Sequence, residues 1–200
     1  MNATEKLNTA EPDVEIHPWP PFYSPDSKIL IMGTFPPQPK RWSMNFYYPN
    51  PTNDFWPMMA LIFLGDRRAL NLPGSKTFDL DAIKALLVEH GIAMNDTGHK
   101  IRRLMGNASD KFLEIIAPVD LDGLLKLMPE CHTVATTGEK AAGVVAELTS
   151  TVPPKMGEYV TSPGGLEIWR MPSTSRAYPL KLERKAEYYA AMFRHAGVLK

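Results

Sequence analysis

The sequence predicts an α/β fold, a three-layer α/β/α sandwich around a mostly parallel four-stranded sheet. Short apolar runs alternate with amphipathic segments along the chain, and this alternation is typical of parallel strands connected by helices. The run Lys28–Gly33 is almost wholly apolar and ends in glycine, as expected of a strand buried on both faces. The length of 200 residues, of which 44% are hydrophobic, is sufficient for one hydrophobic core.

Helical spacing of apolar side chains indicates where the helices lie. Phe55, Met58 and Ile62 recur at that spacing, so we expect a helix from about Asp54 with Asn53 as its N-cap. Further helices are expected at residues 79–90, 121–128, 139–149 and 181–196, and further strands at 92–95, 133–136 and 167–171.

Three segments fall outside this regular alternation. Residues 158–161 and 167–171 flank a Pro-Gly-Gly sequence and are expected to form a hairpin or a broken last strand. Asp110 is expected to cap a short helix at Lys111–Ile116. Residues 1–14 are polar and have no hydrophobic period, so we expect a flexible N-terminal tail before a single domain at residues 15–200.

Composition and motifs exclude several classes of protein. The 22 basic and 22 acidic residues cancel, so the chain lacks the global basic field of many nucleic-acid-binding proteins. A single cysteine, Cys131, excludes an internal disulfide and a cysteine-based metal cage. The five histidines have no metal-ligand spacing and no phosphate-loop fingerprint is present, so no metal and no cofactor are expected. No apolar stretch reaches the length of a signal peptide core or a membrane span, which favours a cytoplasmic protein with no membrane partner.

The candidate site lies at the carboxyl ends of the predicted strands, where ligands bind to parallel sheets. Three segments directly follow predicted strands: the long loop 34–53, the turn 95–99 and the segment 172–178. They are far apart in the sequence, but the fold is expected to bring them together. Several of the 19 prolines lie in the long loop, which favours a stiff and functional loop.

Two of these segments carry side chains suited to a nucleotide. The long loop combines aromatic rings such as Tyr48 with amides such as Asn53, which suits a planar, hydrogen-bonding ligand; the plainer alternative is that the rings only cover the core. Residues 172–176 place small hydroxyls and backbone N–H groups at a strand end, where Arg176 or Lys181 could add positive charge for a phosphate. The alternative there is helix capping by the serine and threonine hydroxyls.

Taken in order, three motifs resemble the uracil-DNA glycosylase superfamily. They are Gly33–Pro37, then the run Tyr48–Trp56 with its Asn-x-Phe-Trp sequence, and finally Met171–Arg176 with its Pro-Ser-Thr-Ser turn. The chain looks closest to the hypoxanthine-DNA glycosylase-type branch, which shares a Tyr-Tyr-x-x-Pro-x-Asn-x-Phe-Trp run. The resemblance extends over about residues 15–197 and includes Asn107–Asp110 in the middle of the chain.

The resemblance implies a monofunctional DNA glycosylase of base excision repair. Such an enzyme flips a deaminated base, hypoxanthine or uracil, out of double-stranded or single-stranded DNA and hydrolyses its N-glycosidic bond, acting as a monomer without a cofactor. By position, Asn53 and Asp96 are the expected catalytic residues. The expected base-binding residues are Phe35, Tyr48 and Asn95, and the expected DNA-binding residues are Ser173, Thr174, Ser175, Arg176 and Lys181.

Two positions depart from the pattern of the family. Phe35 stands where well-studied branches carry an Asp or Asn that positions water, and Met171 stands where they carry a His or Asn that stabilises charge. A member that binds nucleic acid or a nucleobase without hydrolysis is therefore one alternative, and an enzyme acting on a small nucleoside is another. Two groups of basic residues, at 100–103 and 181–185, are candidate contacts to the DNA backbone. The plainer interpretation is that they are solvent-exposed helix ends. His99 is a further candidate because it lies near the expected site.

Overall fold

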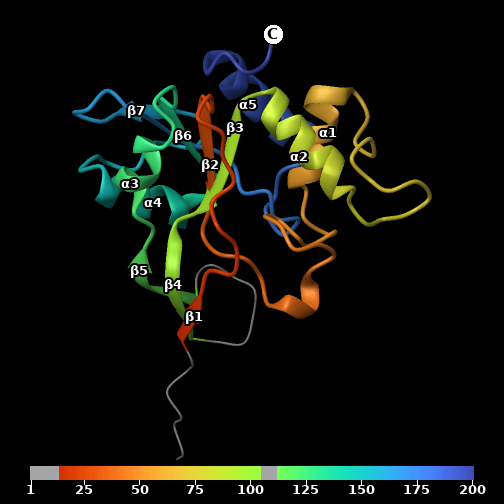
Figure 1. Cartoon of the computed structure of the whole chain (residues 1–200), viewed down its shortest axis with the longest axis horizontal. Helices are drawn as coiled ribbons and strands as arrows, with labels where there is room; N and C mark the ends of the chain where they lie inside the picture. Colours follow the sequence, from red (N-terminus) through yellow and green to blue (C-terminus); the bar gives the residue numbers. More distant parts are fainter. Residues whose placement is uncertain (1–13, 105–111) are drawn as a thin grey trace, which may run out of the picture.

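A computed structural model describes residues 14–104 and 112–200. A five-stranded sheet lies at its centre, and Figure 1 shows how the helices are arranged around it. The strand order is β3-β2-β6-β8-β7, and every neighbouring pair is parallel except β7 and β8. The bounds of these strands are β2 Ile29–Gly33, β3 Ile92–Asp96, β6 Thr133–Thr136, β7 Tyr159–Thr161 and β8 Glu167–Arg170. All four parallel strands therefore end at one edge of the sheet.

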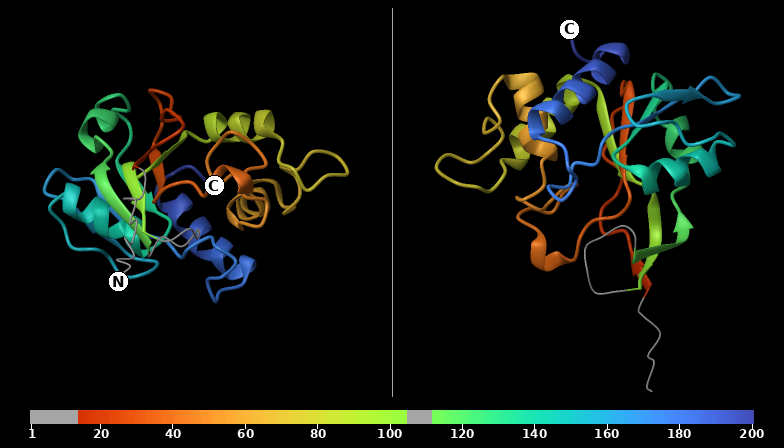
Figure 2. Two further views of the ribbon diagram at one scale, coloured as in Figure 1. Left: turned by 90° about the horizontal axis from the view of Figure 1, so that it is seen from below. Right: turned by 180° about the vertical axis from the view of Figure 1, so that it is seen from behind.

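Helices cover both faces of this sheet, as Figure 2 shows. Their bounds are α1 Phe55–Leu64, α2 Leu80–Glu89, α3 Leu121–Lys126, α4 Glu139–Leu148 and α5 Leu182–His195. Because successive strand residues point to opposite faces, Ile29 and Ile31 pack with α1, α2 and α5, whereas Leu30 and Met32 pack on the side of α3 and α4. The predicted α/β/α sandwich is confirmed.

A second, three-stranded antiparallel sheet extends below the first one. It has the order β1-β4-β5, with β1 at Val14–Ile16, β4 at Gly98–Arg103 and β5 at Leu113–Pro118. Only Thr97 separates β3 from β4, so the chain passes directly from the large sheet to the small one. This small sheet holds the N-terminal segment, residues 14–22, against the carboxyl end of β3, through backbone bonds that include His17 N–H to His99 O.

Three expectations about the elements were wrong. The central sheet has five strands rather than four, because Tyr159–Thr161 pairs with β8 as an antiparallel edge strand. The expected helix at residues 111–116 is instead strand β5, whose alternating burial is the period of a strand rather than a helix. The expected turn at residues 95–99 contains the end of β3 and the start of β4. Residues 1–13 and Asn107–Asp110 lie outside the described residues.

The other predicted elements are confirmed to within a few residues at their ends. Helix α2 begins after Asp79, whose carboxylate accepts a hydrogen bond from Ala82 N–H and caps the helix. The hairpin of β7 and β8 closes around Pro163–Gly165 as expected. In the part of the chain that the structure describes, none of the helices has the length and apolar character needed to cross a membrane.

Candidate active site

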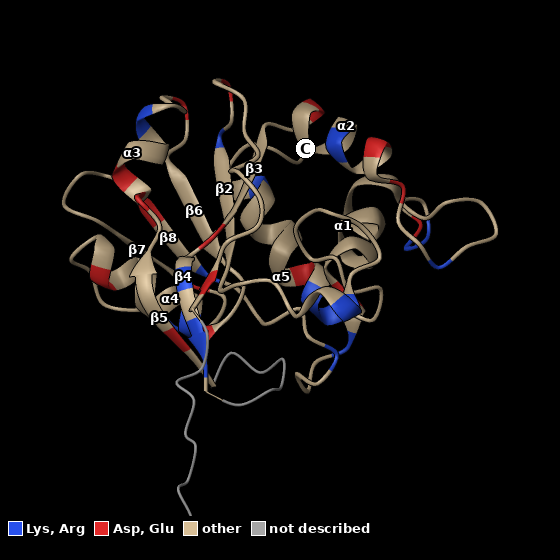
Figure 3. Ribbon diagram, turned by 60° about the horizontal axis from the view of Figure 1, so that its bottom comes forward, with Lys and Arg blue, Asp and Glu red and all other residues tan. Residues whose placement is uncertain are grey.

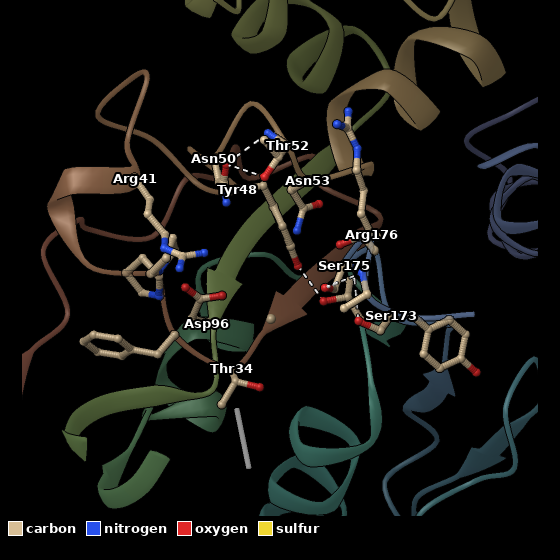
Figure 4. A pocket seen from close by; sticks show the side chains of 18 of the residues that line it. Thr34, Arg41, Tyr48, Asn50, Thr52, Asn53, Asp96, Ser173, Ser175 and Arg176 are labelled. Atoms are coloured by element: carbon tan, nitrogen blue, oxygen red, sulfur yellow. Dashed lines mark hydrogen bonds between the residues drawn. The ribbon is translucent and has the colours of Figure 1, made fainter. Parts of the chain in front are cut away.

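A cavity with a volume of about 760 Å³, called the main cavity below, lies at the carboxyl ends of the parallel strands (Figure 4). Gly33 ends β2 and Asp96 ends β3, while Thr137 follows β6 and Ser173 follows β8; all four line the cavity. The long loop and the segment after β8 complete its wall. The lining residues are Gly33, Thr34, Phe35, Pro36, Pro37, Arg41, Tyr48, Asn50, Thr52, Asn53, Asp96, Thr137, Ser173, Thr174, Ser175, Arg176, Ala177, Tyr178 and Pro179.

Tyr48 projects between the two halves of the main cavity, with Asp96 and Arg41 on one side and Ser173 and Ser175 on the other (Figure 4). Its ring stacks on Phe55 with a centroid distance of 3.9 Å and an interplanar angle of 14°. Its hydroxyl lies 2.7 Å from Thr137 Oγ1. These two contacts fix the position of the ring.

The backbone at Tyr48 is strained, with a φ of 51° in the left-handed region. For a bulky residue this conformation costs on the order of 1–3 kcal/mol, and it persists only where the surrounding structure enforces it. The stacking on Phe55 and the hydrogen bond to Thr137 are the contacts that hold the ring in place here. The strained backbone conformation at Tyr48 therefore places its ring in the cavity.

Gly33 brings the carboxylate of Asp96 and the hydroxyl of Tyr48 close to the backbone of β2. A Cβ atom at this position would lie 2.6 Å from Asp96 Oδ1 and 3.0 Å from the Tyr48 hydroxyl. The first distance would force the Asp96 side chain to shift, and the second would crowd the Tyr48 hydroxyl. The glycine thus lets these two groups meet at the floor of the cavity.

Asn53 presents the donor end of its amide to the cavity. Its Oδ1 accepts a hydrogen bond of 2.9 Å from Phe55 N–H, which satisfies the first free N–H group of α1. The residue at the N-cap position is Asp54 rather than the expected Asn53, and the Asp54 side chain makes no capping bond. Among the described residues the Asn53 Nδ2 group has no hydrogen-bond acceptor, so it remains able to donate to a ligand.

The serine turn, Ser173–Arg176, forms the opposite wall of the main cavity. Ser173 Oγ accepts from Ser175 N–H at 3.3 Å, and Ser175 Oγ accepts from Ala177 N–H at 3.2 Å. Thr174 is buried, with its carbonyl accepting a hydrogen bond from Asp54 N–H. The exposed Ser175 and Arg176 side chains are the part of this turn that can meet a large ligand.

A buried ion network joins the serine turn to the start of α1. The Lys185 side chain is completely buried, and its Nζ donates to Asp54 Oδ2 at 2.9 Å and to Ser175 O at 2.8 Å. Arg176 Nε donates to Asp54 Oδ1 at 3.1 Å. The expectation that Lys185 belongs to an exposed basic group was wrong, because α5 turns this residue towards the core.

Phe35 is held in the cavity wall by a second buried cation. The Arg103 guanidinium lies 5.6 Å from the centroid of the Phe35 ring and donates to Pro36 O at 2.7 Å. Its remaining N–H groups bind Glu15 at 2.7 and 3.2 Å. Arg103 therefore shapes the wall rather than extending an exposed basic group; Lys100, by contrast, is exposed.

Charges of both signs are spread over the molecule, as Figure 3 shows, in agreement with the net charge of zero. Exposed cations that face the main cavity are Arg41 and Arg176. Among the described residues no group of three or more His, Cys, Asp or Glu side chains could hold a metal ion.

The structure brings most of the expected site residues into the main cavity, but not all of them. Asn95 and Lys181 do not line it. Lys181 is exposed at the start of α5, whereas Asn95 is buried and lines a second, smaller cavity behind the Asp96 carboxylate. Met171 is 1% exposed and packs in the core, so it takes no part in the wall of the main cavity. His99 also lines the second cavity.

Tyr47 holds the Asn95 amide in place. Burial, and after it the nearby Asp96 carboxylate, raise the pKa of the Tyr47 hydroxyl far above its usual range, so it keeps its proton. That hydroxyl lies 3.2 Å from Asn95 Oδ1 and 3.0 Å from Pro20 O, and these two oxygens share its single proton. The Asn95 side-chain oxygen is therefore bound to Tyr47 inside the protein rather than facing the main cavity.

Sequence reasoning missed one contact of the site. His17 Nε2 lies 3.0 Å from Asp96 Oδ2, so a residue of the N-terminal segment binds a candidate catalytic carboxylate. The two residues are 79 positions apart, and no spacing rule connects them. The only signal in the sequence was the His-Pro-Trp-Pro-Pro run at residues 17–21, which indicated an ordered aromatic segment.

Comparison with known proteins supports the fold. No model of a protein family matches the chain, and no curated protein matches it. Solved structures do match, among them the solution NMR structure of a Methanosarcina acetivorans protein that is provisionally assigned as a uracil DNA glycosylase. The TM-score is 0.65 at 21% sequence identity, and the match covers 92% of this chain and 99% of that chain. The chain therefore has a uracil-DNA-glycosylase-like α/β fold, as the three sequence motifs predicted.

Proposed function

We propose that the protein is a DNA glycosylase that removes a deaminated base, hypoxanthine or uracil, from DNA. The observation that carries this proposal is the shared cavity: Tyr48, Asn53 and Asp96 face Ser173 and Arg176 across one space at the sheet edge. Its volume of about 760 Å³ lies within the range of sites for small organic ligands and exceeds the need of one flat base. The sequence motifs favour the hypoxanthine-type branch of the superfamily.

Each wall has a distinct task in this proposal. The base stacks on the Tyr48 ring face opposite Phe55, and the Asn53 Nδ2 group donates to a carbonyl oxygen of the base. Ser175 and Arg176 bind the phosphate beside the flipped nucleotide. Phe35 closes the floor against the base.

The chemistry assigned to Asp96 is that of a charge stabiliser and base. The bond between C1′ and the base nitrogen breaks with its electron pair leaving on the base, which forms a sugar cation similar to an oxocarbenium ion. A water oxygen then bonds to C1′ as one of its O–H bonds breaks and gives its proton to Asp96 Oδ1. Asp96 releases this proton to solvent, and the departing base anion takes up one proton from solvent. The products are the free base and an abasic site. Asn53 stabilises the negative charge that develops on the base.

The test is a panel of duplexes that contain uracil, hypoxanthine or xanthine, with an undamaged duplex alongside. We expect chromatography to detect the free base and alkali to cleave the strand at the abasic site for at least one damaged base. Asn53→Ala removes a donor to the developing charge and is expected to slow release about 100-fold. Asn45→Ala, an exposed amide of the same loop that does not line the main cavity, serves as the matched control.

The other outcomes separate the alternatives. Salt-dependent binding of the duplex without release of any base would assign the protein to a non-hydrolytic role, as Phe35 and Met171 at the family's usual catalytic positions favour. Release from free nucleosides at the same rate as from duplexes would contradict DNA as the substrate.

A further inference from the structure

The Asp96 carboxylate has two oxygens in different surroundings. Oδ1 lies above Gly33 at the floor of the main cavity, at 2.6 Å from where a Cβ atom would stand. Oδ2 faces away from that cavity and lies 3.0 Å from His17 Nε2, within hydrogen-bond distance. Asp96 lines both cavities and is 6% exposed, so it stands in the wall between them.

Packing fixes the His17 ring. The Phe35 and Trp19 rings meet it edge-on at centroid distances of 5.4 and 5.8 Å, and the Tyr47 ring stacks on it at 5.7 Å and 25°. Its side chain is only 5% exposed. A ring enclosed in this way has no other rotamer available without moving these aromatic neighbours, so it can hold Asp96 in one orientation.

The second ring nitrogen is also bound. His17 Nδ1 lies 2.8 Å from Trp19 O, and because a carbonyl oxygen only accepts, Nδ1 donates in this contact. Trp19 N–H lies farther from the same nitrogen, at 3.3 Å, and the shorter contact decides. With Nδ1 bound to the Trp19 backbone and Nε2 bound to Asp96 Oδ2, both ring nitrogens hold the ring in this orientation.

We propose that His17 is the positioning residue of the site: it binds Asp96 Oδ2 so that Oδ1 alone is presented to the reacting sugar and water. The inference rests on the proposed function and adds to it a residue from the N-terminal segment. A carboxylate free to rotate would exchange its oxygens and lose the alignment that catalysis requires. The role of His17 is therefore to raise the rate of the chemical step rather than to bind DNA.

The second cavity allows a sharp test. It has a volume of about 300 Å³ and is lined by His17, Asn95, Asp96 and His99, together with prolines of the N-terminal segment. Replacing His17 by Ala would open the place of the imidazole ring directly onto this cavity. Free imidazole from solution can then reach Asp96 Oδ2 and take over the missing contact.

The experiment compares His17→Ala, His17→Gln and wild type by single-turnover base release and, separately, by duplex affinity. We expect His17→Ala to release the base about 10 to 100 times more slowly with duplex affinity changed by less than about 3-fold. Added imidazole should restore part of the lost rate to His17→Ala, in proportion to its concentration, and leave the rate of wild type unchanged. His17→Gln, which keeps an N–H donor, should keep more activity than His17→Ala. Circular dichroism confirms that each variant is folded, and His132→Ala, an exposed histidine outside both cavities, is the control.

Three results would overturn the inference. The first is a folded His17→Ala variant that releases the base at the wild-type rate. The second is a slow His17→Ala variant whose rate is improved neither by imidazole nor by Gln at position 17. The third is that His17→Ala lowers the rate of Asp96→Asn by the same factor as it lowers the rate of wild type. The last result would show that His17 does not act through Asp96. Failure of the proposed function is a different observation, since wild type would then release no base from any duplex.

Discussion

At the scale of single residues, the site depends on the close approach that Gly33 allows. We expect Gly33→Ala to push Asp96 Oδ1 or the Tyr48 hydroxyl away, because the new Cβ would lie 2.6 and 3.0 Å from them. The predicted loss is at least about 10-fold in base release, with a fall in the free energy of unfolding of about 1–3 kcal/mol. Single-turnover kinetics and urea unfolding measure the two effects.

Gly143→Ala is the matched control for that substitution. This glycine lies inside α4, and a Cβ there would meet nothing within 4 Å. Alanine favours a helix, so stability should stay the same or rise by up to about 1 kcal/mol, with unchanged activity. Full activity of a folded Gly33→Ala would show that the Asp96 and Tyr48 positions do not matter for the reaction.

The role of a residue could be predicted where its side chain lies at the end of a strand. It could not be predicted where the role depends on a contact with a residue far away in the sequence. Asp96 ends β3 and Ser173 follows β8, and the parallel topology alone places both at one edge of the sheet. His17 binds Asp96 through the small sheet formed by β1 and β4, which sequence patterns did not predict. Asn95 was expected at the base for the same reason as Asp96, but consecutive residues of a strand point to opposite sides.

At the scale of elements, Lys185 connects α5 to the start of α1 and to the serine turn. We expect Lys185→Met to lower the free energy of unfolding by roughly 3 kcal/mol, because it leaves the buried Asp54 carboxylate without the ammonium 2.9 Å away. Chemical denaturation measures this loss. Lys181→Met, four residues earlier and exposed, should change stability by less than about 0.5 kcal/mol.

A double variant tests whether the pair acts as a unit. Lys185→Met combined with Asp54→Asn should cost less than the sum of the two single losses, since the second change removes the carboxylate that has already lost its lysine partner. Additive losses would mean that the contact between Lys185 and Asp54 contributes nothing of its own.

The burial of Lys185 could have been predicted from the sequence pattern of α5. Lys185 lies three residues after Leu182 and four residues before Tyr189, both of which are buried, so the three share one face of the helix. A lysine on the apolar face of a helix indicates a buried acidic partner rather than a DNA contact. Strand β5 was predicted as a helix because Asp110 is a typical N-cap residue, and the six residues of β5 are too few for a strand period to outweigh that signal.

At the scale of the whole molecule, the reactivity of the buried Cys131 thiol measures how often unfolding exposes the core. Burial raises the pKa of its thiol to about 11, despite backbone hydrogen bonds that lower it. The reactive thiolate is therefore scarce in the folded protein at pH 8, and alkylation should be much slower than in denaturant. Since the chain has no other cysteine, reaction with a coloured disulfide reagent gives an unambiguous signal.

The sign of the pH dependence follows from the same shift. The folded state holds the thiol proton more tightly than the unfolded state, so this contribution to stability is complete below pH 9 and is lost as the pH rises towards about 11. Equal alkylation rates in native buffer and in denaturant would show that Cys131 is not enclosed in the core.

The fold as a whole was predictable because its strands are short apolar runs with helices between them. Because they are buried on both faces, β2 and the first three residues of β3 are apolar, and this pattern is visible in the sequence alone. The layers and the position of the main cavity follow from strand order and handedness. What the sequence could not supply were the contacts between distant segments, such as Lys185 with Asp54 and Arg103 with Glu15.

The most direct test is a crystal structure of the Asp96→Asn variant bound to a duplex with one deaminated base. The expected result is the base out of the helix stack, lying on the Tyr48 ring face opposite Phe55, with Asn53 Nδ2 at its edge and the serine turn on the adjacent phosphate. A target base that stays stacked in the duplex, or that is bound anywhere other than the main cavity, would contradict the proposed function.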